Sequence, residues 1–238
     1  DFDGDLAEKY DVIVLPAGTT RSRIVNGLSS RRHDASWRWA YGVGEEGWEK
    51  LRQWVKAGGT LVALGTAVET ARDLLSLPIE PVLPPGGQVA ATPPGRTSTV
   101  DVQQTVEPTS IFYCPGALLH QEHDAAHPIG FGMAERWPVF FRFDQAYRLT
   151  PNADIEAEVV SRYPDEADMS ASGWLLGDEL LRNQANVISF DVEQGTVVTM
   201  GSQIAFRTQA RATFKLLFNA IFQGPATPVD ADTLATLQ

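Results

Sequence analysis

The chain has 238 residues, of which only one is Cys, four are His and three are Met. A single thiol, Cys114, excludes a disulfide framework within the chain, so cysteine usage does not indicate the compartment. No apolar run approaches the roughly 20 residues that a helix needs to cross a bilayer, and we therefore expect no membrane span. The acidic residues at positions 1–5 do not resemble a signal peptide.

Basic residues are also scarce. The chain carries 19 Lys and Arg against 30 Asp and Glu, which gives a net charge of −11. This charge would repel a phosphate backbone, so nucleic-acid binding is not expected. Apolar residues are not lacking: they make up 43% of the sequence and include 11 Phe and 6 Trp, enough for the core of a globular domain.

The first half alternates strand and helix patterns. Residues 11–15 and 60–65 are apolar runs of the kind that forms strands buried on both faces. Residues 45–57 and 67–77 have apolar positions at helical spacing, and we expect a long loop over 17–44. Strand, helix, strand and helix in this order predict a right-handed parallel βαβ unit.

The second half is richer in strand patterns. Pro and Gly break the earlier alternation after residue 78 and predict an insertion over about 78–110. A turn at 193–195, a final helix over 209–222 and a flexible tail over 224–238 are also expected. Strands are expected at 110–113, 117–122, 138–143, 155–163, 186–192 and 196–200.

Six segments resemble one known family when they are taken in order. They are residues 10–15, 44–65, 112–116 (FYCPG), 127–133 (HPIGFGM), 173–177 (GWLLG) and 206–209 (FRTQ). Together they resemble the class I glutamine amidotransferase-like domain found C-terminal to bacterial secreted zinc carboxypeptidases, which are carboxypeptidase A-like metallopeptidases. The resemblance covers most of residues 5–223.

The resemblance implies an α/β, three-layer, flavodoxin-like fold with a mostly parallel sheet and added antiparallel strands. It makes residues 1–223 one domain that lacks an opening strand, helix and second strand. The strand at 11–15 would then need a neighbour from upstream residues, from another protein segment or from a rearranged sheet. It also implies a secreted or periplasmic protein, with any zinc held in an upstream metallopeptidase domain and no cofactor in this chain.

The amidotransferase nucleophile is a Cys on a tight turn after a buried strand. The equivalent position here holds Thr66, and no His follows His127, so the late His of the family triad is absent. A helix N-cap is the favoured role for Thr66. The amidotransferase triad is not present in this sequence.

Cys114 and the nearby histidines form a second candidate site. Cys114 ends an apolar strand before Pro115, which favours a packed residue over a nucleophile. His120, His123 and His127 would approach one another on a helix and could then bind a metal. On a strand, which the resemblance favours, His120 and His123 point to opposite faces, and His127 is expected to cap the turn at Pro128.

Two further groups are candidates for ligand binding. Trp37, Trp39 and Tyr41 alternate in the long loop and could stack on a sugar or peptide, although packing onto the sheet is the favoured interpretation. Arg207 and Gln209 could hold an anion before the last helix, although a structural tie is favoured there.

Three functional hypotheses follow. The first is a non-catalytic accessory domain of a secreted zinc carboxypeptidase-like protein, which packs on the protease domain or helps to bind its substrate. The second is an amidotransferase-like hydrolase with a relocated site around Cys114 and His127. The third is a carbohydrate-binding module that uses the Trp37–Trp39–Tyr41 loop.

Overall fold

The computed structural model describes residues 5–28, 34, 36–83, 112–167 and 169–226. Its helices are α1 (Arg21–Asn26), α2 (Gly44–Lys56), α3 (Ala67–Leu75) and α4 (Phe214–Gln223). Its strands are β1 (Val12–Leu15), β2 (Thr60–Leu64), β3 (Ile79–Pro81), β4 (Tyr113–His123), β5 (Arg136–Phe141), β6 (Tyr147–Leu149), β7 (Glu156–Arg162), β8 (Ser170–Leu176), β9 (Ala185–Val192) and β10 (Gly195–Met200). In these ranges no helix has the length and apolar character that crossing a membrane requires.

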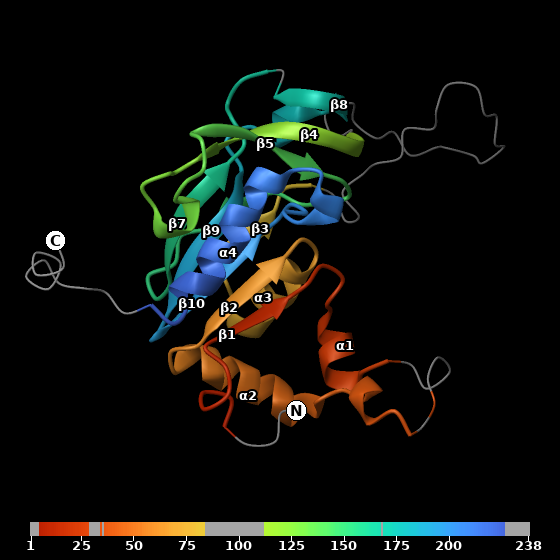
Figure 1. Ribbon diagram of the computed structural model, residues 1–238, viewed down its shortest axis with the longest axis vertical. Helices are drawn as coiled ribbons and strands as arrows, with labels where there is room; N and C mark the ends of the chain where they lie inside the picture. The colour runs from red at the N-terminus through yellow and green to blue at the C-terminus, as the bar shows by residue number, and fades with distance from the viewer. Residues whose placement is uncertain (1–4, 29–33, 35, 84–111, 168, 227–238) are drawn as a thin grey trace, which may run out of the picture.

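All the described strands join one mixed sheet, in the order β1-β2-β10-β9-β7-β4-β5 with β3, β6 and β8 attached to its sides (Figure 1). Parallel pairing is confined to β1, β2 and β10. The other pairings are antiparallel, starting with the β9–β10 hairpin, whose turn places Glu193 at φ 57°. The antiparallel part is therefore larger than the few added strands that the sequence led us to expect.

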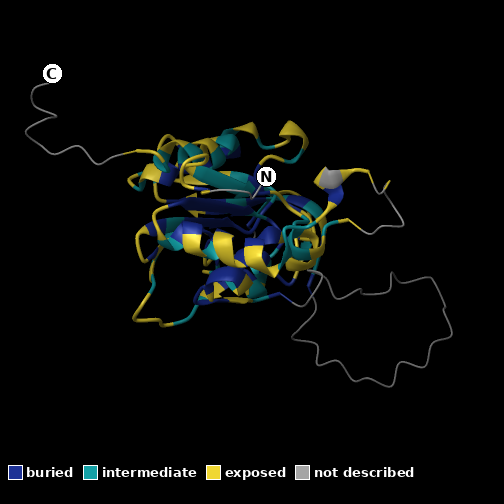
Figure 2. Ribbon diagram, turned by 90° about the horizontal axis from the view of Figure 1, so that it is seen from below, coloured by how far each residue is buried: buried dark blue, intermediate teal, exposed yellow. Residues whose placement is uncertain are grey.

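β2 is the centre of the parallel part and is buried on both faces. Leu61 faces the apolar cluster beneath α2 and α3, and Val62 faces the cluster beneath α4. Both side chains have 0% exposure. Figure 2 shows buried strands between helices whose outer faces are exposed. The helices thus form the outer layers of a three-layer arrangement.

A separate apolar cluster fills the antiparallel end of the sheet. Cys114, Leu119, Phe141, Tyr163 and Met169 are among its fully buried members. β4 contains the whole of the strand expected at 117–122 and also Tyr113, the last residue of the strand expected at 110–113, whose residues 110 and 111 lie outside the described part; its pairing with β8 has a register shift between Tyr113 and Gly116. β8 was not expected, because its sequence SASGWLL contains Gly and lacks a regular alternation.

Several boundaries differ from the expectations. The expected loop at 17–44 contains α1, whose N-cap Thr20 Oγ1 accepts a hydrogen bond from the Arg23 amide at 3.3 Å. The insertion was expected over about 78–110, but Ile79–Pro81 form β3 of the sheet, and residues 84–111 lie outside the described part. The last helix begins at Phe214 and not at 209, since Ala210 has φ −123° and ψ 71°, which interrupts a right-handed helical backbone after Gln209.

Because β2 supports both layers, Leu61→Ala should lower the free energy of unfolding by about 2–5 kcal/mol. Urea-induced unfolding measures the change. The matched control is Leu176→Ala on β8, where the side chain is 45% exposed and truncation should cost much less. An equal loss in the two variants would contradict the central role of β2.

Candidate functional site

The turn between β2 and α3 is where the resemblance of the sequence places the amidotransferase nucleophile. Gly65 has φ +53°, and Thr66 stands directly before α3. Thr66 Oγ1 accepts a hydrogen bond from the Gly18 amide at 2.8 Å, and it makes no cap bond to its own helix. Thr66 therefore stands at the N-cap position of α3, as expected. Its side chain, however, hydrogen-bonds to the loop after β1 and does not cap the helix.

Cys114 lies in the interior of the antiparallel end, with 0% exposure. Its Sγ is 4.0 Å from the carbonyl oxygen of Phe141. Burial raises the pKa of the thiol to about 11, with a small addition from the Asp144 charge. A thiol with this pKa stays protonated near neutral pH, and the thiolate is the nucleophilic form.

The native protein should therefore not react with Ellman's reagent, and unfolding in guanidinium chloride should release one reactive thiol, since Cys114 is the only cysteine. Absorbance at the thionitrobenzoate band measures the reaction. A Cys114→Ala variant provides the blank. Fast reaction of the folded protein would show that Cys114 is accessible.

The histidines on β4 do not converge. Residues of a strand alternate between its faces, so His120 and Glu122 share one face while Gln121 and His123 share the other. The burial agrees: Glu122 is exposed, whereas Gln121 and His123 are buried. Within the described ranges, no three His, Cys, Asp or Glu side chains are grouped so that they could hold a metal ion.

His127 fastens the turn between β4 and β5. Its Nδ1 accepts a hydrogen bond from the Ile129 amide at 3.1 Å, where Pro128 begins a short 3-10 helix, η3 (Pro128–Gly130). With Nδ1 accepting, Nε2 donates to Glu158 Oε2 at 3.0 Å. Both ring nitrogens are therefore engaged in holding this turn, which is the capping role that Pro128 led us to expect.

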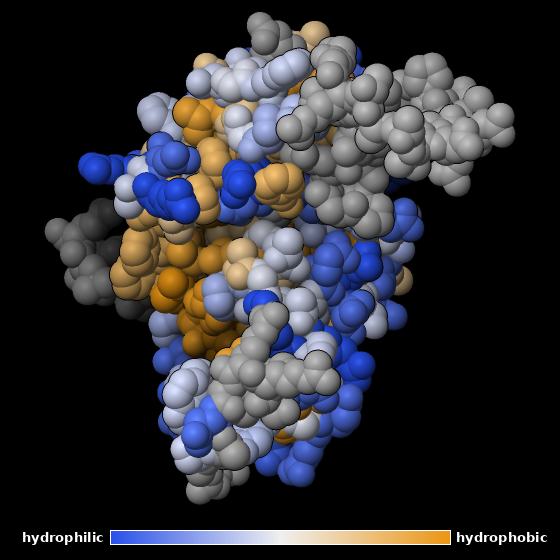
Figure 3. Space-filling model, turned by 90° about the vertical axis from the view of Figure 1, so that its right-hand side faces the viewer, coloured by the Kyte–Doolittle hydropathy of each residue, from blue (hydrophilic) through white to orange (hydrophobic). Residues whose placement is uncertain are grey.

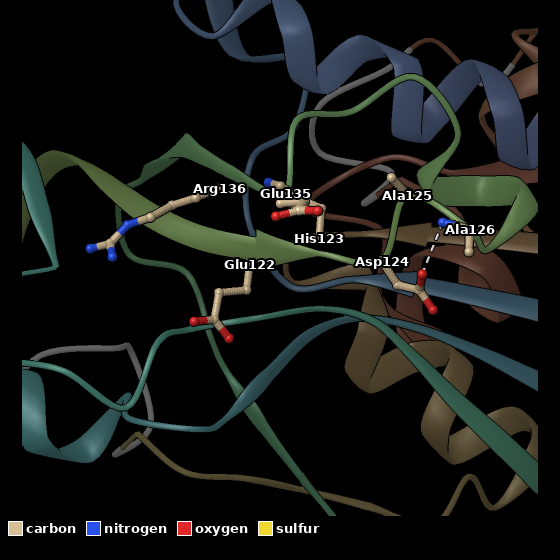
Figure 4. Close-up of a pocket in the computed structure, with 7 residues that line it drawn as sticks. All are labelled: Glu122, His123, Asp124, Ala125, Ala126, Glu135 and Arg136. Atoms are coloured by element: carbon tan, nitrogen blue, oxygen red, sulfur yellow. Dashed lines mark hydrogen bonds between the residues drawn. The ribbon is translucent and has the colours of Figure 1, made fainter.

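An open hollow of about 510 Å³ lies at the end of β4, and Figure 4 draws the residues around it. It is lined by Glu122, His123, Asp124, Ala125, Ala126, Glu135 and Arg136. The charged side chains diverge: Glu122 and Arg136 point apart, and Asp124 accepts from the Ala126 amide at 2.9 Å. Arg136 instead pairs with Glu166 at 3.0 Å. The hollow thus lacks a set of groups that face one another.

His123 lies in the wall of this hollow and is 5% exposed. Its ring nitrogens make no hydrogen bond of normal geometry to the described residues, although the Trp137 backbone lies close enough to act on the ring. Burial lowers the pKa of His123 to about 4. His123 is consequently neutral near pH 7.

A buried polar network lies nearby and was not recognised in the sequence. Gln121 Oε1 accepts from Ser161 Oγ at 2.7 Å and from Asn186 Nδ2 at 2.9 Å. Asn186 Oδ1 in turn accepts from Ser202 Oγ at 2.9 Å, and Ser202 lies 3.0 Å from the Tyr163 hydroxyl. The network joins three strands to the loop after β10. Its members are far apart in the sequence, so no local sequence pattern predicts the network.

Asp144 fixes a second loop at the same end. Its Oδ2 accepts from the Arg142 amide at 2.9 Å and the Gln203 amide at 3.2 Å, while Gln203 Nε2 donates to the Arg142 carbonyl at 2.7 Å. Asp144 is 3% exposed. Burial raises the pKa of its carboxyl to about 7. One carboxyl group thus ties the loop after β5 to the loop after β10.

Ionisation of Asp144 should destabilise the fold. Because the folded-state pKa is about 7 and the ordinary value is 3.8, the folded protein binds this proton more tightly than the unfolded chain. The free energy of unfolding should fall as the pH rises through this interval, by at most about 4 kcal/mol. An Asn does not titrate, so the stability of Asp144→Asn relative to wild type should increase from about pH 4 to about pH 8.

Denaturant unfolding of both proteins across this range provides the test. The lowered pKa of His123 acts in the opposite direction, and it cancels when the two proteins are compared. A difference that stays constant with pH would contradict a raised pKa at Asp144.

The two groups of ligand-binding candidates are both on the surface. Trp37 and Trp39 are 45% and 72% exposed, and their rings stack on each other with centroids 5.4 Å apart. Tyr41 is 54% exposed, so the expected packing of these rings onto the sheet was wrong. Arg207 and Gln209 precede a further 3-10 turn, η6 (Arg211–Thr213), and therefore do not stand at the N-terminus of α4.

No family model and no curated protein matches this chain. Solved structures similar in fold include a ThuA-like protein from Parabacteroides merdae, with 14% identity over 94% of this chain and 75% of that protein, at a TM-score of 0.49. The cytoplasmic protein STM3548 from Salmonella typhimurium has 13% identity over 90% and 71% of the two chains, at a TM-score of 0.47. A ThuA-like protein from Bacteroides uniformis has 16% identity over 94% and 74%, at a TM-score of 0.40. These likenesses concern the fold alone.

Proposed function

We propose that this chain is a non-catalytic accessory domain that joins another protein segment along the free edge of β1. The proposal rests on the exposure of that edge and on its lack of a second described strand partner. Among the described strands, β1 pairs only with β2. Val12, Ile13 and Val14 are only partly buried, although their sequence is that of an interior strand.

The free edge has unpaired backbone groups as well as apolar side chains. The Thr60 amide donates to the Asp11 carbonyl at 3.1 Å, so the backbone groups of Asp11 point toward β2. Since backbone groups alternate along a strand, Val12 and Val14 direct their N–H and C=O groups away from β2. An open parallel edge of this kind is a template for a further strand.

The apolar surface continues from β1 onto α4. Val12, Val14 and Leu217 are partly buried against the cluster beneath α4. Phe218 and Phe222 are 50% and 72% exposed, and their rings stack with centroids 6.5 Å apart. Figure 3 shows a hydrophobic area on the side of the molecule where β1 and α4 lie. On the opposite face of β1, Ile13 is also only partly buried.

A strand followed by an amphipathic helix would fit this surface. The strand would pair with β1, and the helix would cover the exposed flank of α4. Burying a Phe side chain contributes about 1.5–3 kcal/mol, and each added backbone hydrogen bond about 1 kcal/mol. Covering Phe218, Phe222 and the edge of β1 would therefore stabilise an association considerably.

The resemblance of the sequence supplies the finer part of the proposal. On this resemblance, the segment that pairs with β1 belongs to a secreted zinc carboxypeptidase-like protein. The zinc of that protein lies in its metallopeptidase domain. The accessory domain packs on that domain or helps to bind its substrate. The buried state of Cys114 supports a non-catalytic role, since a nucleophile must reach its substrate.

Hydrogen exchange of single amides tests the free edge. In the isolated chain the amides of Val12 and Val14 should exchange rapidly, whereas the Ile13 amide, which faces β2, should be protected. In the natural full-length polypeptide the Val12 and Val14 amides should become protected as well, because a further strand accepts their hydrogen bonds. Ile13 is the internal control.

A surface variant tests the helix side. Phe218→Ser combined with Phe222→Ser should reduce the protection of Val12 and Val14 in the full-length polypeptide, while Leu176→Ser on the exposed strand β8 should not. If the two valine amides exchange equally fast in both polypeptides, the proposed pairing is wrong.

A further inference from the structure

A second hollow, of about 350 Å³, lies where the segment after β10 packs against the antiparallel end of the sheet. It is lined by Gly116, Ala117, Leu118, Phe140, Ser172, Gly173 and Gln209. Strands β4, β5 and β8 provide the floor, and the 3-10 turn η5 (Phe206–Thr208) with Gln209 provides a wall. None of these residues belongs to the β1–α4 surface.

Two arginines stacked on aromatic rings lie next to residues that line this hollow. Phe140 and Phe206 stack with centroids 5.0 Å apart and planes 5° apart, and the Arg207 guanidinium lies 5.0 Å from the Phe206 centroid. The Arg142 guanidinium lies 4.8 Å from the Phe143 centroid. A Cβ atom at Gly116 would be 4.0 Å from Arg142 Cδ and 4.0 Å from the Phe140 ring.

The backbone that presents these arginines is held in place. Asp144 and Gln203 tie the Arg142 loop to the loop after β10, as described above. Arg207 and Thr208 have φ of 47° and 57°, values that non-glycine residues seldom adopt. Conformational strain of this kind is concentrated at binding and catalytic sites.

Neither arginine forms an ion pair with the described residues. The Arg142 charge acts on buried Asp144, but only as the smallest of the contributions to its pKa. Stacking restricts the side chains without neutralising them, and the guanidinium fork matches a carboxylate.

We propose that this hollow binds a peptide carboxylate, with Arg207 and Arg142 as its charge partners and an adjacent apolar side chain against Phe140. A nucleic acid is disfavoured by the net charge. The carboxylate is that of an Asp or Glu side chain or that of a free C-terminus.

Three short peptides distinguish these sources in a calorimetric titration of the full chain. Acetyl-Phe-Glu-amide carries a side-chain carboxylate, acetyl-Phe-Gln with a free C-terminus carries a terminal one, and acetyl-Phe-Gln-amide carries none. We expect one of the first two to bind at least tenfold more tightly than the neutral peptide. Its affinity should fall as the salt concentration rises.

Variants locate the site. Arg207→Gln and Arg142→Gln should each weaken binding of the preferred peptide about tenfold or more, and Arg148→Gln, an exposed arginine on β6, should leave it unchanged. Thermal unfolding confirms that each variant is folded, and Arg207→Lys serves in place of Arg207→Gln if the latter does not fold. The inference is overturned if no peptide binds, if the neutral peptide binds equally well, or if Arg148→Gln causes the same loss.

Discussion

β2 has a parallel neighbour on each side and apolar contacts on both faces, and the remaining structure is arranged around this strand. Leu61 contacts the layer of α2 and α3, while Val62 contacts the layer of α4. A strand buried in this way needs every backbone group paired, which β1 and β10 provide. The same requirement applies to β1, but there it is met on one side only. Among the described strands, the edge of β1 that faces away from β2 is therefore left open.

The antiparallel end of the sheet follows a different principle. Its interior combines an apolar cluster around Cys114 and Phe141 with a chain of buried polar groups from Gln121 to Tyr163. Such groups are tolerated only when their hydrogen bonds are made within the protein. Here the bonds join strands to the loop after β10, and Asp144 ties that loop to the loop after β5, so together these bonds hold the backbone from which the exposed arginines extend. The buried polar groups of this end therefore support a surface feature and do not form a catalytic site.

The two proposed binding surfaces differ in chemistry. The β1–α4 surface is apolar and has free backbone groups, which suits a folded segment that buries a large area. The arginine hollow is small and charged, which suits a short ligand that can dissociate. They lie on opposite ends of the sheet order, since β1 is at one edge and β4, β5 and β8 are at the other.

Local sequence was sufficient to predict the parallel unit, but the run at 11–15 predicted a strand buried on both faces, whereas Val12, Ile13 and Val14 are only partly buried. The apolar runs at β1 and β2 and the periodicity of α2 and α3 are local signals that depend on burial, and each element formed within a few residues of its expected bounds. The absence of a Cys at Thr66 and of a late His was equally visible. Strands without regular alternation, such as β8, and the short helix α1 gave no such signal.

The extent of antiparallel pairing, the complete burial of Cys114 and the surface position of Trp37 and Trp39 emerged from the tertiary structure. The same holds for the grouping of Arg142, Asp144 and Gln203. Contacts between residues some sixty positions apart depend on strand order and loop packing, which no local pattern encodes.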